Sequence, residues 1–527
     1  MTQSGSGMAR AALLLSTTVI LSRILGYGRE VALYTIFGQN YTTDAYQAAF
    51  SIPDSLYMLL IGGALGSALI PVFSARIVAG REDEAWKAAS IVFNYIILLL
   101  AVLLLIAYRY TSPLIHVLAP GLPQEYLALA AGLSRIMFIQ TVFMVLNGFS
   151  MGILNSYHHF YTPAWGSLLY NVVIIVCGVG LAEKFGIAAF SLGVTLGAVA
   201  SFLVQLPALK RVGLRYYPSF ALGDPGFREI VALTAPMLAG LGVVQFNLLV
   251  TQNLASSLGP GVLSALKLAQ RIMNLPIGIF AVSIGTVLFP TLTVLSARGK
   301  WKQFKHSTAL GVKAIFLLTL PASLGLMAIG ENALTLLFEH GNFTADMTRL
   351  TSQALLYYAI GIAAYSAVQV VDRSFYALKD TVSPVLAAVL SIGINIALSL
   401  WLVGNMRHLG LALAYSLAGI ANLLLLLLGL RLKLGFLGGR SMAISLAKSL
   451  AAAGSMYLGV RLLQNYLLAG LPYNPTLNLT LSLGISTTAG VVLYGVITHL
   501  FNTEEGRLVL GMVQSRMRGK RGDGSGV

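Results

Sequence analysis

The chain has 527 residues, of which 57% are hydrophobic and 10% are charged, and its mean hydropathy is +0.80. Soluble domains carry ~25% charged residues, so this composition excludes a soluble enzyme or binding module and indicates an integral membrane protein. In a soluble protein the net charge of +16 would suggest a nucleic-acid partner. Here basic cytoplasmic loops account for it, and we expect no nucleic acid.

The first apolar run, residues 11–37, is long enough to cross a bilayer, which takes ~20 apolar residues. It carries Arg23, which a rise of ~1.5 Å per residue places ~18 Å from Ala11 and near mid-bilayer, and Arg29 ~9 Å further on. A charged side chain at that depth costs at least ~2.5 kcal/mol, so it usually faces a protein interior or a wet cavity. We expect this helix to present positive charge to something inside the membrane.

Further apolar runs follow at intervals. Together with the first they make fourteen predicted transmembrane helices, near 11–37, 43–75, 88–109, 126–154, 163–182, 186–208, 229–256, 262–297, 306–330, 346–378, 384–404, 409–431, 441–465 and 476–500. When alternate connections are assigned to opposite sides, most of their Lys and Arg residues fall on one side, which predicts that both termini are cytoplasmic. The basic tail, residues 506–527, is expected to contact anionic membrane lipids.

Short sequences recur in order at a separation of about 220 residues, which indicates an internal duplication. The matched pairs are GSALIPVFS at 66–74 with GTVLFPTLT at 285–293, YTP at 161–163 with VSP at 382–384, and AFSL at 189–192 with AYSL at 414–417. We therefore predict an all-α membrane protein with two six-helix lobes, residues 1–225 and 226–435, and two further helices within 436–505. Because six is even, the halves are parallel repeats, an architecture suited to alternating access around a site between them.

A second pair of cations, Lys267 and Arg271, lies four residues apart and so shares one helix face. Together with Arg23 and Arg29 of the first half, these side chains could converge on a central cleft. A cationic cavity favours an anionic substrate, and Arg forks suit phosphate oxygens. Two roles stay open for Arg29, because Glu30 or Asp44 could pair with it structurally.

Prolines and glycines interrupt the helices at related places in both halves. We predict gating bends at Pro53, Gly62, Gly66 and Pro276, with static kinks as the alternative.

Two acidic residues inside the predicted spans, Asp54 and Asp372, are candidates for ion coupling, and structural pairing explains them equally well. The chain has no GxxxxGK motif followed by Ser or Thr, so ATP is not the expected direct energy source, and a monovalent cation or the membrane potential is the candidate drive. No catalytic pair and no metal-ligand spacing is found, and we expect neither an enzyme nor a cofactor or metal.

Several segments resemble the MurJ (MviN) family, lipid II flippases of the MOP exporter superfamily. The segments are SRILGYGREVALYTIFG at 22–38, TDAYQAAFSIP at 43–53, GSALIPVFSA at 66–75, LAPG at 118–121, LSALKLAQRIMNLPIGIFAVSIGTVLFPTL at 263–292, LFEHGNFTADMTRLTSQALLYYAIG at 337–361 and RSFYALKDTVSP at 373–384. The resemblance implies a V-shaped pair of lobes in the bacterial cytoplasmic membrane. It implies outward movement of lipid II, the undecaprenyl-diphosphate-linked peptidoglycan precursor.

The resemblance also assigns residues. Arg23, Arg29 and Arg271 match the family's essential cavity arginines, Asp44 matches the acidic residue that opens the second helix, and Lys267 could assist. The two helices within 436–505 would form a groove for the lipid tail.

This chain departs from the family pattern around Ser51, where many members have a basic residue, and at Gly62. The cavity is therefore less charged than is usual, and alternatives stay open. They are a flippase for another polyprenyl-diphosphate-linked polysaccharide precursor, a multidrug antiporter, and a scaffold for envelope synthesis that transports nothing.

Overall fold

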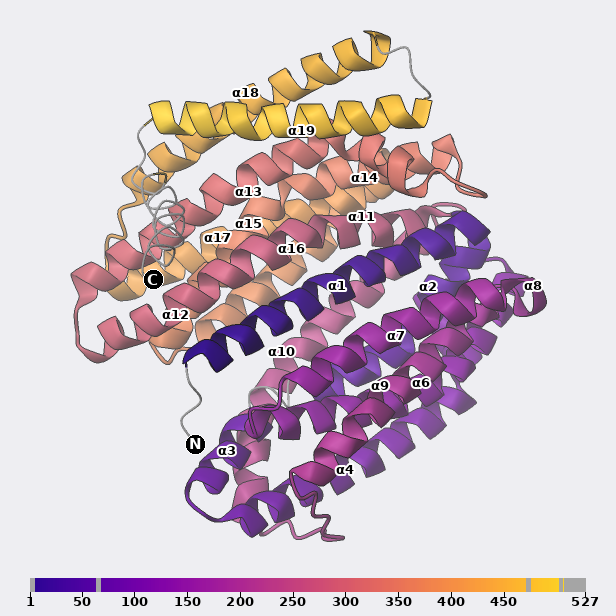
Figure 1. Cartoon of the computed structure of the whole chain (residues 1–527), viewed down its shortest axis with the longest axis vertical. Coiled ribbons are helices and arrows are strands. Elements are labelled where there is room, and N and C mark those ends of the chain that lie inside the picture. The colour runs from indigo at the N-terminus through magenta and orange to yellow at the C-terminus, as the bar shows by residue number, and fades with distance from the viewer. Residues whose placement is uncertain (1–4, 63–67, 471–474, 502–505, 507–527) are drawn as a thin grey trace, which may run out of the picture. The chain divides into compact units, whose positions relative to one another are not determined.

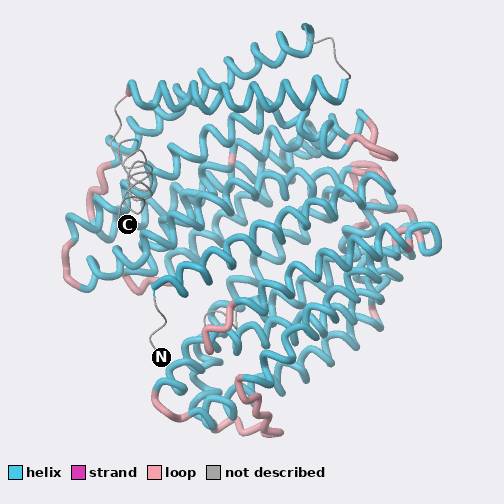
Figure 2. The backbone as a smooth tube through the Cα atoms, viewed as in Figure 1, coloured by secondary structure: helices cyan, strands magenta, loops and turns pink. Residues whose placement is uncertain are grey.

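The computed structural model describes residues 5–62, 68–470, 475–501 and 506. Every regular element in these ranges is helical, and the tube in Figure 2 contains no strand in the part of the chain that is described. Gly66, one of the predicted bends, and the basic tail from residue 507 onward lie outside the described residues.

The chain divides into two compact units. Unit 1 comprises Met1–Ser264 and His340–Thr344, and unit 2 comprises Ala265–Glu339 and Ala345–Val527. The helices of unit 1, labelled in Figure 1, are α1 (Gly5–Phe37), α2 (Tyr41–Tyr57), α3 (Ile70–Val78), α4 (Glu82–Arg109), α5 (Thr111–Leu118), α6 (Gln124–Ser156), α7 (Tyr161–Gly180), α8 (Ala182–Phe185), α9 (Ala188–Arg211) and α10 (Pro225–Ser256).

Helix α11 begins in unit 1 and continues into unit 2. Unit 2 is built from α11 (Val262–Pro276), α12 (Val282–Ala297), α13 (Trp301–Phe338), α14 (Ala345–Ile360), α15 (Ile362–Ala377), α16 (Val382–Met406), α17 (His408–Leu434), α18 (Gly439–Gly470) and α19 (Pro475–Leu500). Two π-helical segments, η1 (Met58–Gly62) and η3 (Ile277–Ala281), directly follow α2 and α11.

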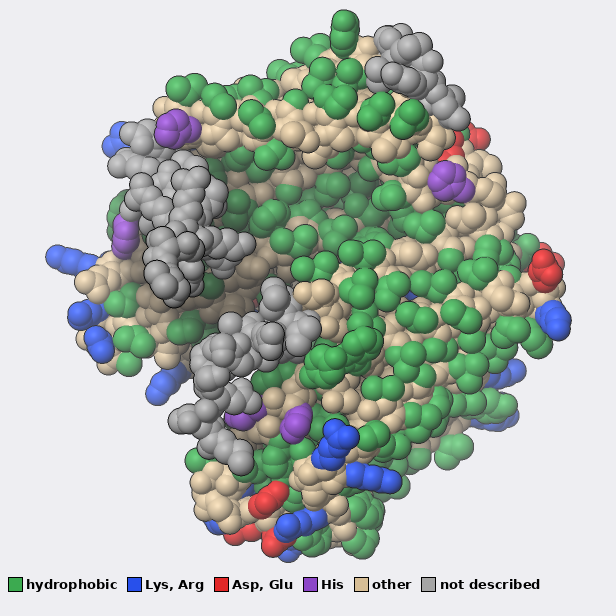
Figure 3. Space-filling view, viewed as in Figure 1, with side chains coloured by type: hydrophobic (Ala, Val, Ile, Leu, Met, Phe, Trp, Pro, Cys, Tyr) green, Lys and Arg blue, Asp and Glu red, His purple; other side chains and the backbone are tan. Residues whose placement is uncertain are grey.

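Many of these helices are long and apolar enough to cross a membrane. Within the described chain ten qualify, and an eleventh is gained if α14 and α15, which are bent by 42° at their junction, form one span. Large hydrophobic side chains cover the flanks of the helices, while charged side chains gather near helix ends (Figure 3). The chain is therefore a multi-pass membrane protein. Helix α2 has only 17 residues because η1 interrupts it, and the count of fourteen spans stays a prediction.

The duplication expected from the sequence recurs in the backbone. The π segments η1 and η3 occupy matching positions after α2 and α11. Residues with positive φ also pair between the halves: Gly80 (72°) with Gly299 (64°), His158 (60°) with Lys379 (58°), Gly186 (54°) with Arg407 (50°), and Gly213 (77°) with Gly435 (78°). Such conformations are uncommon for residues other than glycine, so their recurrence at matching loops supports two copies of one helical unit.

Helix α10 was expected to open the second half, but its contacts group it with unit 1. Gln252 and Gln245 accept hydrogen bonds from Ser51 at 2.5 Å and Ser55 at 3.2 Å on α2. An ion pair of 3.0 Å joins Arg76, on α3, to Glu229 near the start of α10. The compact unit therefore extends through Ser264, and the boundary of the repeat at residue 225 stays a prediction.

At the edge of unit 2, α18 and α19 lie side by side along α13 (yellow in Figure 1). Met456 and Val460 of α18 are buried against Ala328 of α13. Lys448 Nζ donates a hydrogen bond of 3.2 Å to the carbonyl of Phe501, directly after α19. The Lys448 side chain thus satisfies a carbonyl at a helix C-terminus, where a positive charge is also favoured.

Candidate functional site

Helix α1 carries Arg23 and packs against α7. The Ser22 and Ser167 hydroxyls lie 2.6 Å apart, and Asn171 Nδ2 donates to the carbonyl of Ser22 at 3.4 Å. These contacts hold one face of α1 on α7, while the neighbouring Arg23 remains exposed within unit 1. A cation on an exposed face of a membrane helix is available to an anionic ligand.

Arg29, six residues further along α1, has a carboxylate partner. Its Nη2 atom lies 3.0 Å from Glu30 Oε1, and the side chains of Arg29 and Glu30 are only 16% and 5% exposed. The sequence left Glu30 and Asp44 open as structural partners of Arg29. The structure pairs Arg29 with Glu30, so the charge of this arginine is partly neutralised.

Asp44, in the first turn of α2, is buried and binds the N-terminus of α11. Its Oδ2 atom accepts from the Gly261 amide at 2.7 Å, and its Oδ1 atom accepts from the Ser264 amide at 2.8 Å and the Ser264 hydroxyl at 2.6 Å. Backbone amides at a helix start lack partners within the helix and attract negative charge. Asp44 therefore caps α11 from a distant part of the sequence.

Two further elements of unit 1 meet at this cap. Tyr34 of α1 is fully buried; its hydroxyl donates to the Ser264 carbonyl at 3.3 Å and accepts from Gln47 at 3.2 Å. The loop 340–344 adds Phe343, whose ring packs edge-on against Tyr34 with centroids 6.1 Å apart. Asn342 Nδ2 donates at 2.5 Å to the carbonyl of Ile36. The ends of α1, α2 and α11 thus meet around the buried side chains of Tyr34 and Asp44.

The cations predicted on the second half lie on α11 in unit 2. Lys267 and Arg271 are both half-buried and both make polar or electrostatic interactions. Their spacing places them on one face of the helix. Gln270, between them, hydrogen-bonds Tyr415, whose ring stacks on Tyr365 at 4.7 Å. The aromatic packing thus anchors the helix that presents the two cations.

The two acidic candidates for ion coupling differ in exposure. Asp54 on α2 is exposed within unit 1, and Asp372 on α15 is half-buried within unit 2. The neighbouring Arg373 lies over the Phe289 ring at 5.7 Å and forms no ion pair with Asp372 among the described residues. In the part of the chain described, no three His, Cys, Asp or Glu side chains group in a way that could hold a metal ion.

The helix breaks coincide with predicted bends. Pro53 lies within α2 and Gly62 ends η1, while Pro276 ends α11 just before η3. Proline removes a backbone donor, and π-helical turns often mark functional positions in helices. In the first half the helix changes to π between Tyr57 and Met58, four residues after Pro53. In the second half it changes directly after Pro276. A role of these positions in gating stays a prediction.

Sequence reasoning did not identify Gly261 and Ser264 as partners of Asp44. Gly261 has φ +76°, and a Cβ there would lie 2.5 Å from the Gln39 carbonyl oxygen. A glycine directly before a helix has no side chain that could cap it. The glycine before α11 therefore indicated that the cap would have to come from another part of the chain. The partner was not predictable, because Asp44 lies 217 residues away in the chain.

Comparisons with known proteins agree with this architecture. The family model described as "Lipid II flippase MurJ" matches residues 33–480. A lipid II flippase MurJ of Burkholderia cenocepacia is 32% identical over 431 residues, or 80% of this chain and 83% of that protein. A probable lipid II flippase MurJ of Thermotoga maritima is 32% identical over 419 residues, or 79% of this chain and 84% of that protein.

Solved structures show the same likeness. One described as a lipid II flippase MurJ in an inward closed conformation matches with a TM-score of 0.77 and 28% identity, covering 93% of this chain and 98% of that one. An inward-facing multidrug resistance transporter of the MATE family, in the MOP superfamily, matches with a TM-score of 0.67 and 15% identity, covering 79% and 95%. The second likeness concerns the fold alone.

Proposed function

Because this chain belongs to the MurJ family of lipid II flippases, we propose that it moves lipid II, the undecaprenyl-diphosphate-linked peptidoglycan precursor, from the cytoplasmic to the outer leaflet. The family is one of transporters, not of enzymes. The observation that carries the proposal is the family match across residues 33–480. The structure supports it with basic side chains on α1 and α11, one helix from each half of the repeat.

In this proposal, arginines hold the diphosphate while the halves alternate access. Arg23 is exposed, and Arg271 shares a half-buried face with Lys267. Guanidinium groups bind phosphate oxygens through paired, charge-assisted hydrogen bonds. Arg29 is already paired with Glu30, so its contribution is smaller or requires that pair to open. Asp44, occupied by the α11 amides, would act by holding that helix.

The helix breaks give the movement a mechanical basis. The residues that flank η1 and η3, Pro53, Gly62 and Pro276, are the proposed bends, together with Gly66 in the undescribed segment. Bending at matching points of both halves would open the site to one side and then to the other. Asp54 and Asp372 are the proposed positions at which a monovalent cation or the membrane potential could couple to this movement.

A second candidate is a flippase for another polyprenyl-diphosphate-linked polysaccharide precursor. The observation that favours it is Ser51, whose hydroxyl is engaged by Gln252 at 2.5 Å. The resemblance to the family implies a basic side chain at this position in many members, so this chain would have one charge fewer there. A changed headgroup with a retained diphosphate site would fit that difference.

Complementation of a bacterium depleted of its own lipid II flippase tests the proposal. We expect the wild-type chain to restore growth and outward exposure of lipid II, and Arg271→Ala to abolish both while the protein still accumulates. Arg298→Ala, at an exposed position after α12, is the matched control and should complement. A well-expressed wild-type chain that fails would favour the second candidate, and a functional Arg271→Ala would remove Arg271 from the site.

A further inference from the structure

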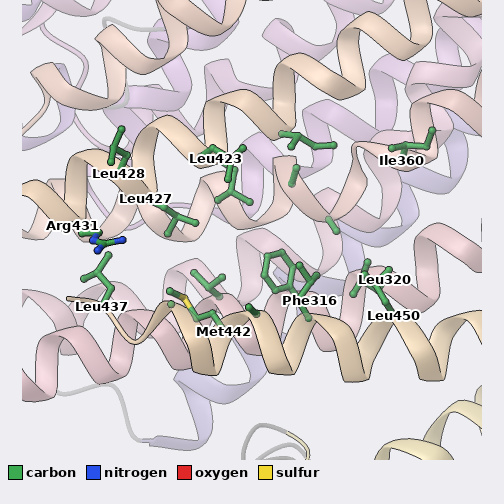
Figure 4. A pocket seen from close by; sticks show the side chains of 18 of the residues that line it. Phe316, Leu320, Ile360, Leu423, Leu427, Leu428, Arg431, Leu437, Met442 and Leu450 are labelled. Carbon is green, nitrogen blue, oxygen red and sulfur yellow. The ribbon is translucent and has the colours of Figure 1, made fainter. Parts of the chain in front are cut away.

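Unit 2 contains an apolar groove between α17 and the first turns of α18, next to α13. Its volume is ≈620 Å³, and it is lined by α13, the end of α14, α15, α17, the loop after α17 and the first three turns of α18. Figure 4 shows Phe316 and Met442 near its middle, Leu320 and Leu450 toward one end, and Arg431 at the other. Arg431 is the single charged residue of the lining.

The groove is open along one side of unit 2. Among its lining side chains, Leu424 is 61% exposed, Leu428 is 53% exposed and Phe436 is 65% exposed. An empty apolar groove of this size would forfeit the dispersion contacts of its whole lining. In a membrane, the hydrocarbon available to fill it is an acyl chain.

A related pocket of unit 1 shows what distinguishes Arg431. That pocket, ≈210 Å³, is lined by the repeat-equivalent helices α4, α6 and α9 and also has one arginine, Arg215. Arg215 forms an ion pair with Asp83. By contrast, Arg431 forms no ion pair among the described residues. The nearby carboxylate of Asp380 is already paired with Lys433, at 2.6 Å. The groove of unit 2 thus ends in a positive charge that is available to a ligand.

We propose that this groove binds one anionic phospholipid of the cytoplasmic leaflet, with an acyl chain along Phe316 and Met442 and the phosphate on Arg431. Arg431 lies in the last turn of α17, at the end that the Lys and Arg distribution predicts to be cytoplasmic, and anionic lipid headgroups lie at that level. The volume suits a single acyl chain better than the much longer polyprenyl chain of lipid II. The resemblance implies that the two helices within 436–505 hold the polyprenyl tail, and α18 is one of them, so a polyprenyl phosphate must be among the probes.

Native mass spectrometry of the full-length protein tests this site, with phosphatidylglycerol, phosphatidylethanolamine and undecaprenyl phosphate as separate probes. We expect Arg431→Gln to weaken phosphatidylglycerol binding roughly tenfold, because a charge-assisted hydrogen bond to the phosphate is lost. Phosphatidylethanolamine also carries a phosphate, but its own ammonium group neutralises the headgroup, so its binding should weaken less. Met442→Trp fills the groove and should weaken both. Leu432→Trp adds the same ring at a side chain that is 79% exposed and does not line the groove, and should weaken neither.

Two results would overturn the proposal. One is wild-type phosphatidylglycerol affinity in Arg431→Gln. The other is displacement of phosphatidylglycerol by undecaprenyl phosphate with the same dependence on Arg431, which would assign the groove to the polyprenyl chain. If Met442→Trp does not accumulate, Leu446→Phe, a smaller addition to the same lining, replaces it. Arg215→Gln, whose parent side chain is already paired with Asp83, should bind phosphatidylglycerol like the wild type.

Discussion

The Oδ2 atom of Asp44 accepts a hydrogen bond of 2.7 Å from the backbone amide of Gly261. With the two bonds from Ser264 at Oδ1, both carboxylate oxygens are engaged by the start of α11. The residue is also only 1% exposed, so a substrate group could reach this carboxylate only if the start of α11 moved away. The structure therefore favours a positioning role for Asp44, and the two roles predict different measurements.

The first prediction concerns this cap. Asp44→Ala should lower the free energy of unfolding by about 1–3 kcal/mol, because buried amides lose their acceptor. Ser264→Ala removes one donor and should cost about 1 kcal/mol. Because the two residues contact each other, the double variant should lose less than the sum of the single variants, with a coupling of at least ~0.5 kcal/mol. Thermal or denaturant unfolding in detergent, together with complementation, measures these effects.

Phe343→Leu provides a nearby control, since it alters packing on Tyr34 without touching the Asp44 carboxylate. Additive losses in the Asp44 and Ser264 variants would contradict the cap. So would an Asp44→Ala protein that keeps wild-type stability and loses only transport, which would indicate direct binding of substrate.

The second prediction concerns Glu30, which is 4% exposed and paired with Arg29. Glu30→Ala leaves a largely buried guanidinium without this carboxylate, and breaking such a pair costs about 3 kcal/mol. Arg23→Ala, at an exposed position on the same helix, should change stability by less than ~1 kcal/mol while abolishing transport. Equal losses of stability in the two variants would show that Arg23 is also structural.

Arg29 pairs with the next residue in the chain, whereas Asp44 binds an amide 217 residues away. The two contacts show which parts of the site the sequence could predict. Long apolar runs predicted the helices, because hydropathy acts locally, and the prolines drew attention to two helices that continue into π segments at residues 58 and 277. The pairing of Arg29 with Glu30 rather than Asp44 depends on rotamers and packing. The Asp44–Gly261 contact depends on the folding of distant segments, which no local pattern encodes.

The third prediction is a pH dependence at the loop before α16, outside the spans. Partial burial opposes ionisation of Asp380, but hydrogen bonds from Lys433 and Ser383 outweigh it and lower the pKa of Asp380 from 3.8 to about 2. A depressed carboxyl pKa stabilises the fold above the unfolded value, and the contribution is lost as pH falls through the folded one. The wild type should therefore have a higher Tm than Asp380→Asn at pH 7, and the difference should shrink between about pH 4 and pH 2.

The matched control for this titration is Lys433→Gln, which removes the partner of Asp380 at 2.6 Å. In that background the pKa of Asp380 should move back toward its ordinary value, and Asp380→Asn should then change the Tm less at neutral pH. A Tm difference that persists unchanged to pH 2 would show that Asp380→Asn destabilises the protein for a reason other than the lost charge.

The last prediction uses the repeated backbone geometry. Lys379 and Gly299 both have left-handed backbones, with φ +58° and +64°. Only Gly299 lacks a side chain, and a Cβ there would meet no atom within 4 Å. A left-handed conformation costs a residue with a side chain about 1 kcal/mol relative to glycine. Lys379→Gly should therefore raise the free energy of unfolding by about 0.5–1 kcal/mol, and Gly299→Ala should lower it by a similar amount.

His158→Gly, at the matching loop of the first half with φ +60°, should behave like Lys379→Gly. Denaturant unfolding of the three variants compares the loops directly, and a loss of stability in both glycine variants would mean that the side chains of Lys379 and His158 contribute more than the backbone strain they impose.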